Sequence, residues 1–247
     1  MDYLDFLRAL HQRLEPKRYL EIGVRWGQSL GVSRCLSVGI DPAFSIKSEL
    51  HTDVHLFRTT SDEYFARPEP LAPVGGEPFD LTFIDGMHLF EFALRDFINA
   101  ERHSSRSGLI IFDDVLPRTA QEAARDRTTS AWTGDIYPIL PVLARYRPDV
   151  LTLAVDTTPT GLLMVVGLDP SNTVLSDNYD EIIAEFRSQD PQPVPPEILD
   201  RTFVQAPQRV LRSPLLDVLA GPDSGSTDLA QRLKQTAAVH LGPAYAD

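Results

Sequence analysis

Cysteine, lysine and long apolar runs are all scarce in this sequence. Cys35 is the only cysteine, so neither an intrachain disulfide nor a thiolate metal cluster can form. No apolar run approaches the roughly 20 residues that a membrane-spanning helix needs. The chain has 23 Lys and Arg residues and 35 Asp and Glu residues, which gives a net charge of -12. Because phosphate groups are held by clusters of Lys and Arg, this balance argues against nucleic acid or an anionic membrane as the partner.

The length and the first residues set broad limits. With 247 residues, 43% of them hydrophobic, the chain can form one large domain, or one domain with a sizeable appendage. The opening stretch MDYLDFLRALHQRL lacks the basic and apolar regions of a signal peptide. We therefore expect a cytoplasmic location.

Strand-like and helix-like patterns alternate over most of the chain. We expect strands at residues 18–23, 37–41, 55–59, 79–84, 109–112, 150–156 and 162–168. We expect helices at residues 2–14, 28–36, 61–65, 89–103 and 136–146, with Ser61 as the N-cap of the third. This regular order predicts an α/β fold: a doubly wound, Rossmann-like, mostly parallel sheet of seven strands, with the last two strands as an antiparallel pair at its edge.

The character of the sequence changes after residue 169. Prolines cluster in DPQPVPPEILD, and polar residues interrupt every short apolar run. Residues 180–186 and 228–240 keep helix-like patterns. We therefore divide the chain into a domain at 1–169 and a partly helical C-terminal extension at 170–247, with a possible role in homo-oligomer formation or as a lid.

A glycine loop follows the first strand. The stretch YLEIGVRWGQSL places Glu21, Gly23 and Gly27 between a strand and the next predicted helix. Glycine allows positive φ and lets a ligand approach the backbone. The loop has only two glycines of the dinucleotide fingerprint, so a smaller adenosine-containing ligand fits better. Asp41 ends the second strand, where an acid can bind the two ribose hydroxyls.

Two further strands end on acids. Asp85 follows the fourth strand, and Asp113 and Asp114 follow the fifth. If these strands are neighbours, three carboxylates converge at the ligand-binding edge of the sheet. Oxygen ligands of this kind suit Mg²⁺, Ca²⁺ or Mn²⁺, so a metal site is one interpretation. The other is that Asp85 contacts the cofactor or substrate directly, while Asp113 or Asp114 caps the next segment.

His88 is the candidate general base. It lies three residues after Asp85, and a neutral imidazole can accept the proton that a hydroxyl group loses. The alternative is a structural role at the start of the helix expected at 89–103. Trp132 and Asp135 lie in the segment after the fifth strand and are candidates for a substrate lid, with a packing role equally open.

These motifs together resemble a known family. The segments YLEIGVRWGQSL, VGID, FDLTFIDGMHLFEFALRDF and GLIIFDD resemble class I S-adenosylmethionine-dependent methyltransferases, in particular a bacterial small-molecule branch with an I-D-G-x-H motif. The chain is also similar to metal-dependent sugar, macrolide and catechol O-methyltransferases. The resemblance covers about residues 17–168.

The resemblance assigns roles to the motif residues. It implies that Glu21, Gly23 and Gly27 surround the methionine part of S-adenosylmethionine and that Asp41 binds the ribose. Thr60, Ser61 and Asp62 occupy the stretch that meets the adenine. Asp85 is a further cofactor contact and, with His88, a catalytic candidate. Asp85, Asp113 and Asp114 would hold a divalent cation, with Mg²⁺ expected.

The predicted function is methyl transfer from S-adenosylmethionine to a hydroxyl group of a small molecule, such as a sugar or a secondary metabolite. Two alternatives stay open. One is a catalytically inactive methyltransferase-like module for binding or assembly, and the other is a metal-independent N- or C-methyltransferase. The sequence does not identify the acceptor.

Overall fold

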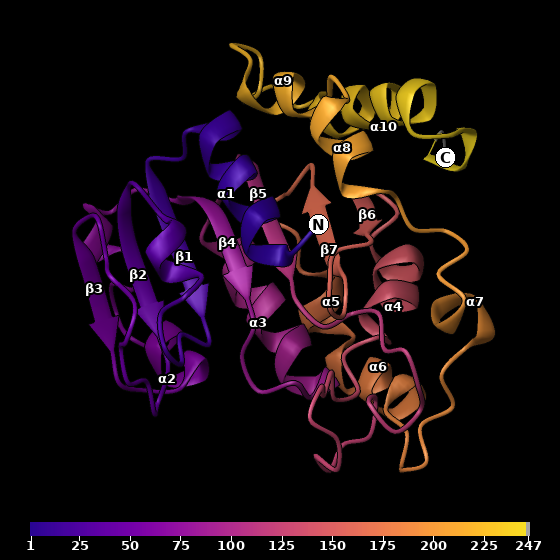
Figure 1. Ribbon diagram of the computed structural model, residues 1–247. Helices are drawn as coiled ribbons and strands as arrows, with labels where there is room; N and C mark the ends of the chain where they lie inside the picture. The colour runs from indigo at the N-terminus through magenta and orange to yellow at the C-terminus, as the bar shows by residue number, and fades with distance from the viewer. Residues whose placement is uncertain (246–247) are drawn as a thin grey trace.

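The fold is built on one sheet, which we describe from a computed structural model covering residues 1–245. Its seven strands are β1 (Arg18–Ile22), β2 (Leu36–Ile40), β3 (Val54–Phe57), β4 (Phe79–Ile84), β5 (Ser104–Phe112), β6 (Leu151–Val155) and β7 (Leu162–Val166). They lie in the order β3-β2-β1-β4-β5-β7-β6 (Figure 1). The predicted doubly wound sheet is confirmed.

The register of the strands brings the acidic residues to one edge. β3, β2, β1, β4 and β5 are parallel, and β7 pairs antiparallel with both β5 and β6. Ile22 pairs with Ile84, and Ile84 pairs with Phe112. The next residues, including Asp85 and Asp113, therefore leave the sheet at the same level. β5 begins five residues earlier than expected, at Ser104.

Both faces of the sheet are buried. Helix α1 (Tyr3–Leu14) packs on one face through Phe6, Leu7 and Leu10, and the side chain of Asp2 caps it by accepting the N–H of Leu4. The other face is covered by α2 (Ser61–Phe65), α3 (Phe90–Arg102) and α4 (Ile139–Tyr146). Successive residues of β5 from Leu109 to Phe112 alternate between these two apolar clusters, as the period of a strand requires.

The C-terminal extension packs on both faces. It contains α5 (Val174–Asp177), α6 (Tyr179–Phe186), α7 (Pro196–Leu199), α8 (Pro207–Arg212), α9 (Leu215–Ala220), α10 (Leu229–His240) and the 3₁₀ turn η3 (Pro243–Tyr245). Both helices predicted in this region are confirmed, as α6 and α10. Helices α8 and α9 lie beside α1 and α10 packs on α9, whereas α6 lies below α4 (Figure 1). Within residues 1–245, no helix is long and apolar enough to cross a membrane.

Two details of the prediction are wrong. The helix expected at 28–36 is only the 3₁₀ turn η1 (Leu30–Val32). The Arg34 guanidinium donates to three carbonyls at the end of this turn, Gly31 to Ser33, so the chain closes on itself instead of continuing as an α-helix. The N-cap of α2 is Thr60 and not Ser61, because Thr60 and Glu63 form a reciprocal capping box. A second 3₁₀ turn, η2 (Ala72–Val74), lies in the expected loop.

Candidate active site

The carboxyl ends of β1 and β4 meet at a glycine. Gly23 has a φ of +89°, and a Cβ placed on it would lie 1.9 Å from the carbonyl oxygen of Asp85. Only glycine fits this close approach of two backbones. Glycine is therefore required at position 23, because the loops that follow β1 and β4 are in contact there.

Two cavities open at this edge of the sheet. The larger has a volume of about 410 Å³ and the smaller about 240 Å³. Gly23, Asp41 and Gly86 line both cavities. The two spaces therefore adjoin along the ends of β1, β2 and β4, where ligands bind in open parallel sheets.

The smaller cavity has apolar walls and a polar end. Its apolar walls come from Ile22, Ile40, Met87 and Phe92. Its polar groups come from Asp41, Thr60, Ser61, Asp62 and Asp96. A flat heteroaromatic base suits such a space, since its faces need apolar contacts and its edge needs hydrogen-bonding partners.

Asp96 was not singled out by the sequence motifs. It lies on α3, is almost fully buried, and accepts a 2.5 Å hydrogen bond from the Ser61 hydroxyl. Burial raises the pKa of its carboxyl to about 7, against the opposing effect of the Ser61 hydrogen bond. No pattern marks Asp96, because it stands in the middle of a helix and is surrounded by ordinary helix residues.

Asp41 lines both cavities. Its Oδ2 accepts the N–H of Arg25 at 2.7 Å, and its Oδ1 accepts the N–H of Ala43 at 2.6 Å. These two bonds hold the carboxylate at the end of β2 and link it to the glycine loop. The remaining lone pairs of its oxygens can accept ribose hydroxyl groups.

Glu21 lies beneath the glycine loop. Its carboxyl is fully buried and accepts hydrogen bonds from Tyr19 at 2.7 Å and Ser29 at 2.9 Å. Burial raises its pKa to about 8, although both hydrogen bonds act in the opposite direction. The structure thus places Glu21 as a support of the loop. Gly27, with a φ of +76°, closes the same loop against Ile46.

His88 lies between two carboxylates. Its Nε2 is 3.1 Å from Oδ1 of Asp85, and its Nδ1 is 3.0 Å from Oδ2 of Asp114. Burial favours the neutral ring, but the hydrogen bonds and charges of Asp114 and Asp85 outweigh it and raise the pKa of His88 to about 11. In this arrangement the imidazole holds its proton at neutral pH and does not accept another.

The acids of this cluster repel one another. Burial, with smaller effects from neighbouring carboxylates, raises the pKa of Asp85 and of Asp113. Possible ligand atoms of Asp85, His88 and Asp114 all lie within 4.8 Å of one another. Asp113 lines the same cavity, and its Oδ1 accepts the N–H of Asp114 at 2.8 Å. A divalent cation fits this donor set, because it would offset the excess negative charge.

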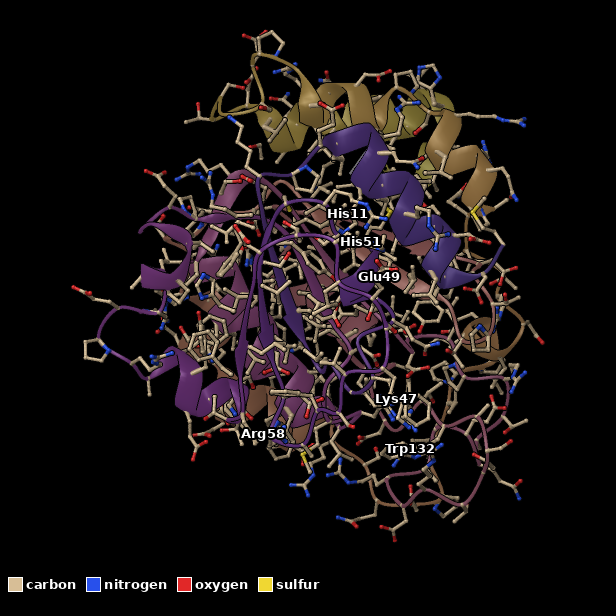
Figure 2. All side chains as sticks on the ribbon, turned by 60° about the vertical axis from the view of Figure 1, so that its left-hand side comes forward. His11, Lys47, Glu49, His51, Arg58 and Trp132 are labelled. Atoms are coloured by element: carbon tan, nitrogen blue, oxygen red, sulfur yellow. The ribbon has the colours of Figure 1, made fainter. Side chains whose placement is uncertain are left out.

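Trp132 packs against His88. The two rings are parallel within 2°, with centroids 5.0 Å apart. Figure 2 places Trp132 near the lower edge of the molecule, towards which the parallel strands point in Figure 1, and far from His11 of α1. A Cβ on Gly134 would lie 1.7 Å from the carbonyl oxygen of His88, so the segment after β5 fits closely over the β4 loop.

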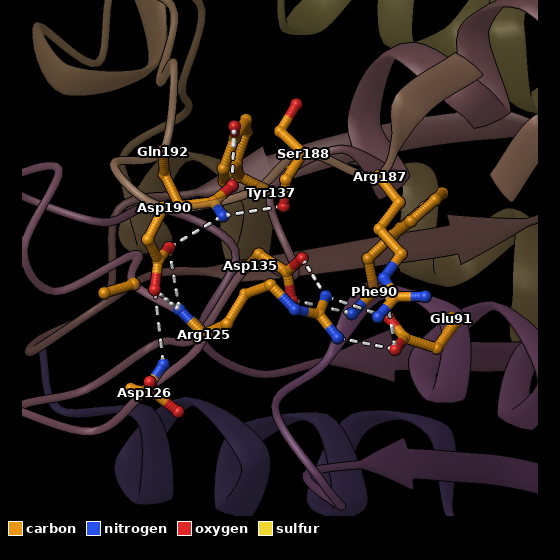
Figure 3. A network of polar contacts seen from close by, with 12 residues as sticks. Phe90, Glu91, Arg125, Asp126, Asp135, Tyr137, Arg187, Ser188, Asp190 and Gln192 are labelled. Atoms are coloured by element: carbon orange, nitrogen blue, oxygen red, sulfur yellow. Dashed lines mark hydrogen bonds and ion pairs between the residues drawn. The ribbon is translucent and has the colours of Figure 1, made fainter. Parts of the chain in front are cut away.

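Asp135 anchors this segment. Its fully buried carboxylate accepts the N–H of Phe90 at 3.1 Å, which caps the start of α3, where Leu89 has no capping side chain. Arg125 pairs with Asp135 and also with Glu91, at 2.6 Å (Figure 3). Of the two lid candidates, Asp135 therefore has a structural role, and Trp132 is the one that lines the cavity.

Other residues of the larger cavity come from distant segments. Tyr3 begins α1, and burial raises the pKa of its hydroxyl, with a further contribution from Asp113. Thr160 donates a hydrogen bond to Asp114, and Arg127 comes from the segment that carries Trp132. The N–H of Tyr3 donates to the Thr158 carbonyl at 3.2 Å, which fixes α1 beside the β6–β7 loop. None of these residues belongs to a recognisable motif.

Comparison with protein families gives a match over part of the chain. A family model described as a methyltransferase domain matches residues 20–115. A search of curated proteins gives no match. Among solved structures, an O-methyltransferase from Bacillus cereus in complex with S-adenosylhomocysteine is 21% identical, with 68% of this chain and 80% of that chain covered and a TM-score of 0.48.

The O-methyltransferase TomG from Streptomyces achromogenes is 20% identical, with 66% of this chain and 78% of that chain covered and a TM-score of 0.48. At such identities a likeness concerns the fold alone. Residues 20–115 match the model of a methyltransferase domain, in agreement with the family expected from the motifs, and the sheet order agrees with the expected fold.

Proposed function

We propose that this protein transfers a methyl group from S-adenosylmethionine to a hydroxyl group of a small molecule, with the help of a divalent cation. One observation carries the proposal. A cavity that suits a nucleoside adjoins, through Gly23 and Asp41, a second cavity that contains the Asp85, His88 and Asp114 cluster. A donor site and an acceptor site would then share one wall.

The smaller cavity and its rim fit the adenosine part of the cofactor. Asp41 would accept the ribose hydroxyls, and Ser61 and Asp62 would bind the edge of the base. Ile40 and Phe92 offer apolar surface to its faces. Gly23 leaves the backbone open where the chain of the cofactor would pass towards the larger cavity. When bound, S-adenosylmethionine supplies a methyl group on a sulfonium, so the main task of the protein is positioning.

The acidic cluster fits a divalent cation. Asp85, Asp113 and Asp114 would hold it, since all three carboxylates line the same cavity. A bound cation supplies Lewis acidity, which lowers the pKa of a coordinated hydroxyl group. The charge of the cation would replace that of the protonated His88 beside the carboxylates. The imidazole could then lose its proton, and the free ring nitrogen could serve as the base. This reconciles the predicted base role of His88 with its bridging position.

The larger cavity suits a small, polar acceptor. Its volume is about 410 Å³, and its walls carry Arg25, Arg127 and Tyr3 in addition to the acids. Trp132 lies with one ring face on His88, and Arg127 lies 5.8 Å from the Trp132 ring centroid. The indole therefore forms a wall of the site and is not a free platform for stacking.

Turnover of hydroxylated small molecules tests this proposal. The full chain is incubated with S-adenosylmethionine and a panel of sugars, catechols and phenols, and products that gain one methyl group are sought by mass spectrometry. We expect a methylated product that is lost on chelation and restored by Mg²⁺ or Mn²⁺. Product that persists after chelation and metal-free dialysis would reject the cation. Cofactor binding without any product would favour the binding-module alternative.

A further inference from the structure

The first turn of α2 is held by two neighbouring residues of α3. Arg95 donates from Nε to both carboxylate oxygens of Asp62, each at 3.1 Å, and from Nη2 to Oδ2 at 2.8 Å. Asp96 accepts the hydroxyl of Ser61 at 2.5 Å. Ser61, Asp62 and Asp96 line the smaller cavity. The polar end of that cavity is therefore fixed by α3.

The C-terminal extension completes this arrangement. Tyr179, the first residue of α6, accepts a hydrogen bond from Nη1 of Arg95 at 2.8 Å and donates one to the carbonyl of Glu91 at 3.0 Å. The guanidinium of Arg95 also lies over the ring of Phe92, 4.4 Å from its centroid. Tyr179 thus fixes Arg95 from the side opposite to Asp62, although it stands 84 residues further along the chain.

The degree of exposure explains why such support matters. The side chains of Arg95 and Asp62 are 31% and 43% exposed. A partly exposed ion pair is weak, because water screens it and both side chains lose rotamer freedom. The Tyr179 hydroxyl accepts a hydrogen bond from Arg95 and donates one to a backbone carbonyl of α3. It therefore restricts the rotamers of Arg95 before the ligand binds.

We propose that Tyr179 of the C-terminal extension is a positioning residue for the cofactor: through Arg95 it orients Asp62 at the wall of the nucleoside cavity and so raises the affinity for the adenosine group. This inference rests on the proposed function and adds a role for the extension besides lid or oligomer contact. It concerns the affinity for the cofactor and not the chemistry of transfer.

The test is a double-mutant cycle on S-adenosylhomocysteine binding. Calorimetry of the full chain compares wild type, Tyr179→Phe, Asp62→Asn and the double variant. Glu185→Gln is the matched control, because Glu185 lies on the same helix and forms an exposed ion pair with Arg145 of α4. Thermal unfolding without ligand shows whether each variant is folded.

We expect Tyr179→Phe to weaken binding by about threefold to tenfold, which is the scale of one hydrogen bond to a charged group at a partly exposed site. Glu185→Gln should bind as wild type does. The double variant should bind no more weakly than Asp62→Asn, because Tyr179 acts through Asp62. Wild-type affinity in Tyr179→Phe, or additive losses in the double variant, would overturn the inference. Absence of binding by wild type would instead overturn the proposed function, and this inference with it.

Discussion

Nδ1 of His88 lies 3.0 Å from Oδ2 of Asp114, and both residues adopt left-handed backbone, with φ of +50° and +61°. One residue follows β4 and the other follows β5. Backbone strain of this kind in non-glycine residues persists where the surrounding structure requires it, and it concentrates at functional sites. The pairing of these two loops is the basis of the cation site that we propose.

Cation binding can be measured directly. We expect the full chain to bind Mn²⁺, detected by the loss of the free-ion signal in electron paramagnetic resonance. Asp114→Ala should weaken this binding by at least about tenfold, since it removes one charged ligand. Asp53→Ala, an exposed acid before β3, is the control and should bind as wild type does. Equal Mn²⁺ binding by Asp114→Ala and wild type would contradict the site.

Tyr3 is expected to contact the acceptor. Its ring packs on Phe83, with centroids 6.3 Å apart, the residue lines the larger cavity, and the charges of Asp113 and Asp85 act on its hydroxyl. Tyr3→Phe keeps the ring and removes one donor. We expect the KM for an acceptor that is turned over to rise about threefold to tenfold, with unchanged affinity for S-adenosylhomocysteine. A change in cofactor affinity of the same size would argue that Tyr3 instead shapes the whole site.

The Arg125 network is expected to stabilise the fold. Replacing Arg125 with Met leaves Asp135 without an ion-pair partner and Glu91 with Arg187 alone, and the Asp135 side chain is fully buried. We expect a loss of about 3–5 kcal/mol in the free energy of unfolding, measured with urea. Arg118→Met breaks an ion pair whose arginine is half-exposed, so it should cost about 1 kcal/mol or less. Similar losses in the two variants would show that burial does not decide the effect.

Glu21 should make stability depend on pH. Its ordinary pKa is 4.5, and burial raises it to about 8 in the folded state. Between these values the unfolded state releases a proton that the folded state keeps. The contribution of Glu21 to stability is thus fully present below pH 4.5, falls as pH rises, and levels off above about pH 8.

The comparison with Glu21→Gln isolates this effect. The free energy of unfolding of wild type minus that of Glu21→Gln should fall across this range, by at most a few kcal/mol, since one pKa unit corresponds to about 1.4 kcal/mol. Urea unfolding at several pH values measures it, and Glu185→Gln, an exposed control, should show no such trend. A difference that stays constant from pH 4.5 to 8 would show that Glu21 is ionised in the folded protein.

The strand-end acids could be predicted because their signal is local. An apolar run followed by an acid marks Asp41, Asp85 and Asp113, and the parallel order of the strands then brings them to one edge. A local signal was not sufficient at residues 28–36, where the apolar spacing favours a helix and the structure has only a 3₁₀ turn. There the carbonyls of the turn are satisfied by Arg34, an interaction that periodicity does not reveal.

The remaining site residues depend on tertiary contacts. Tyr3, Arg127 and Thr160 reach the larger cavity from three separate segments of the chain. Their identities are ordinary for a helix start and for loops. Likewise, nothing in the sequence around Tyr179 indicates that its hydroxyl meets Arg95. Such residues become visible only once the packing of the extension on α3 is known.

Calorimetric titration of S-adenosylhomocysteine into the full chain tests the central claim most directly. We expect saturable binding with one ligand per chain, weakened by about tenfold or more in Asp41→Asn, since that carboxylate would bind the ribose. Asp53→Ala should bind as wild type does. No heat of binding from wild type at high micromolar protein, or equal affinities of wild type and Asp41→Asn, would contradict the account.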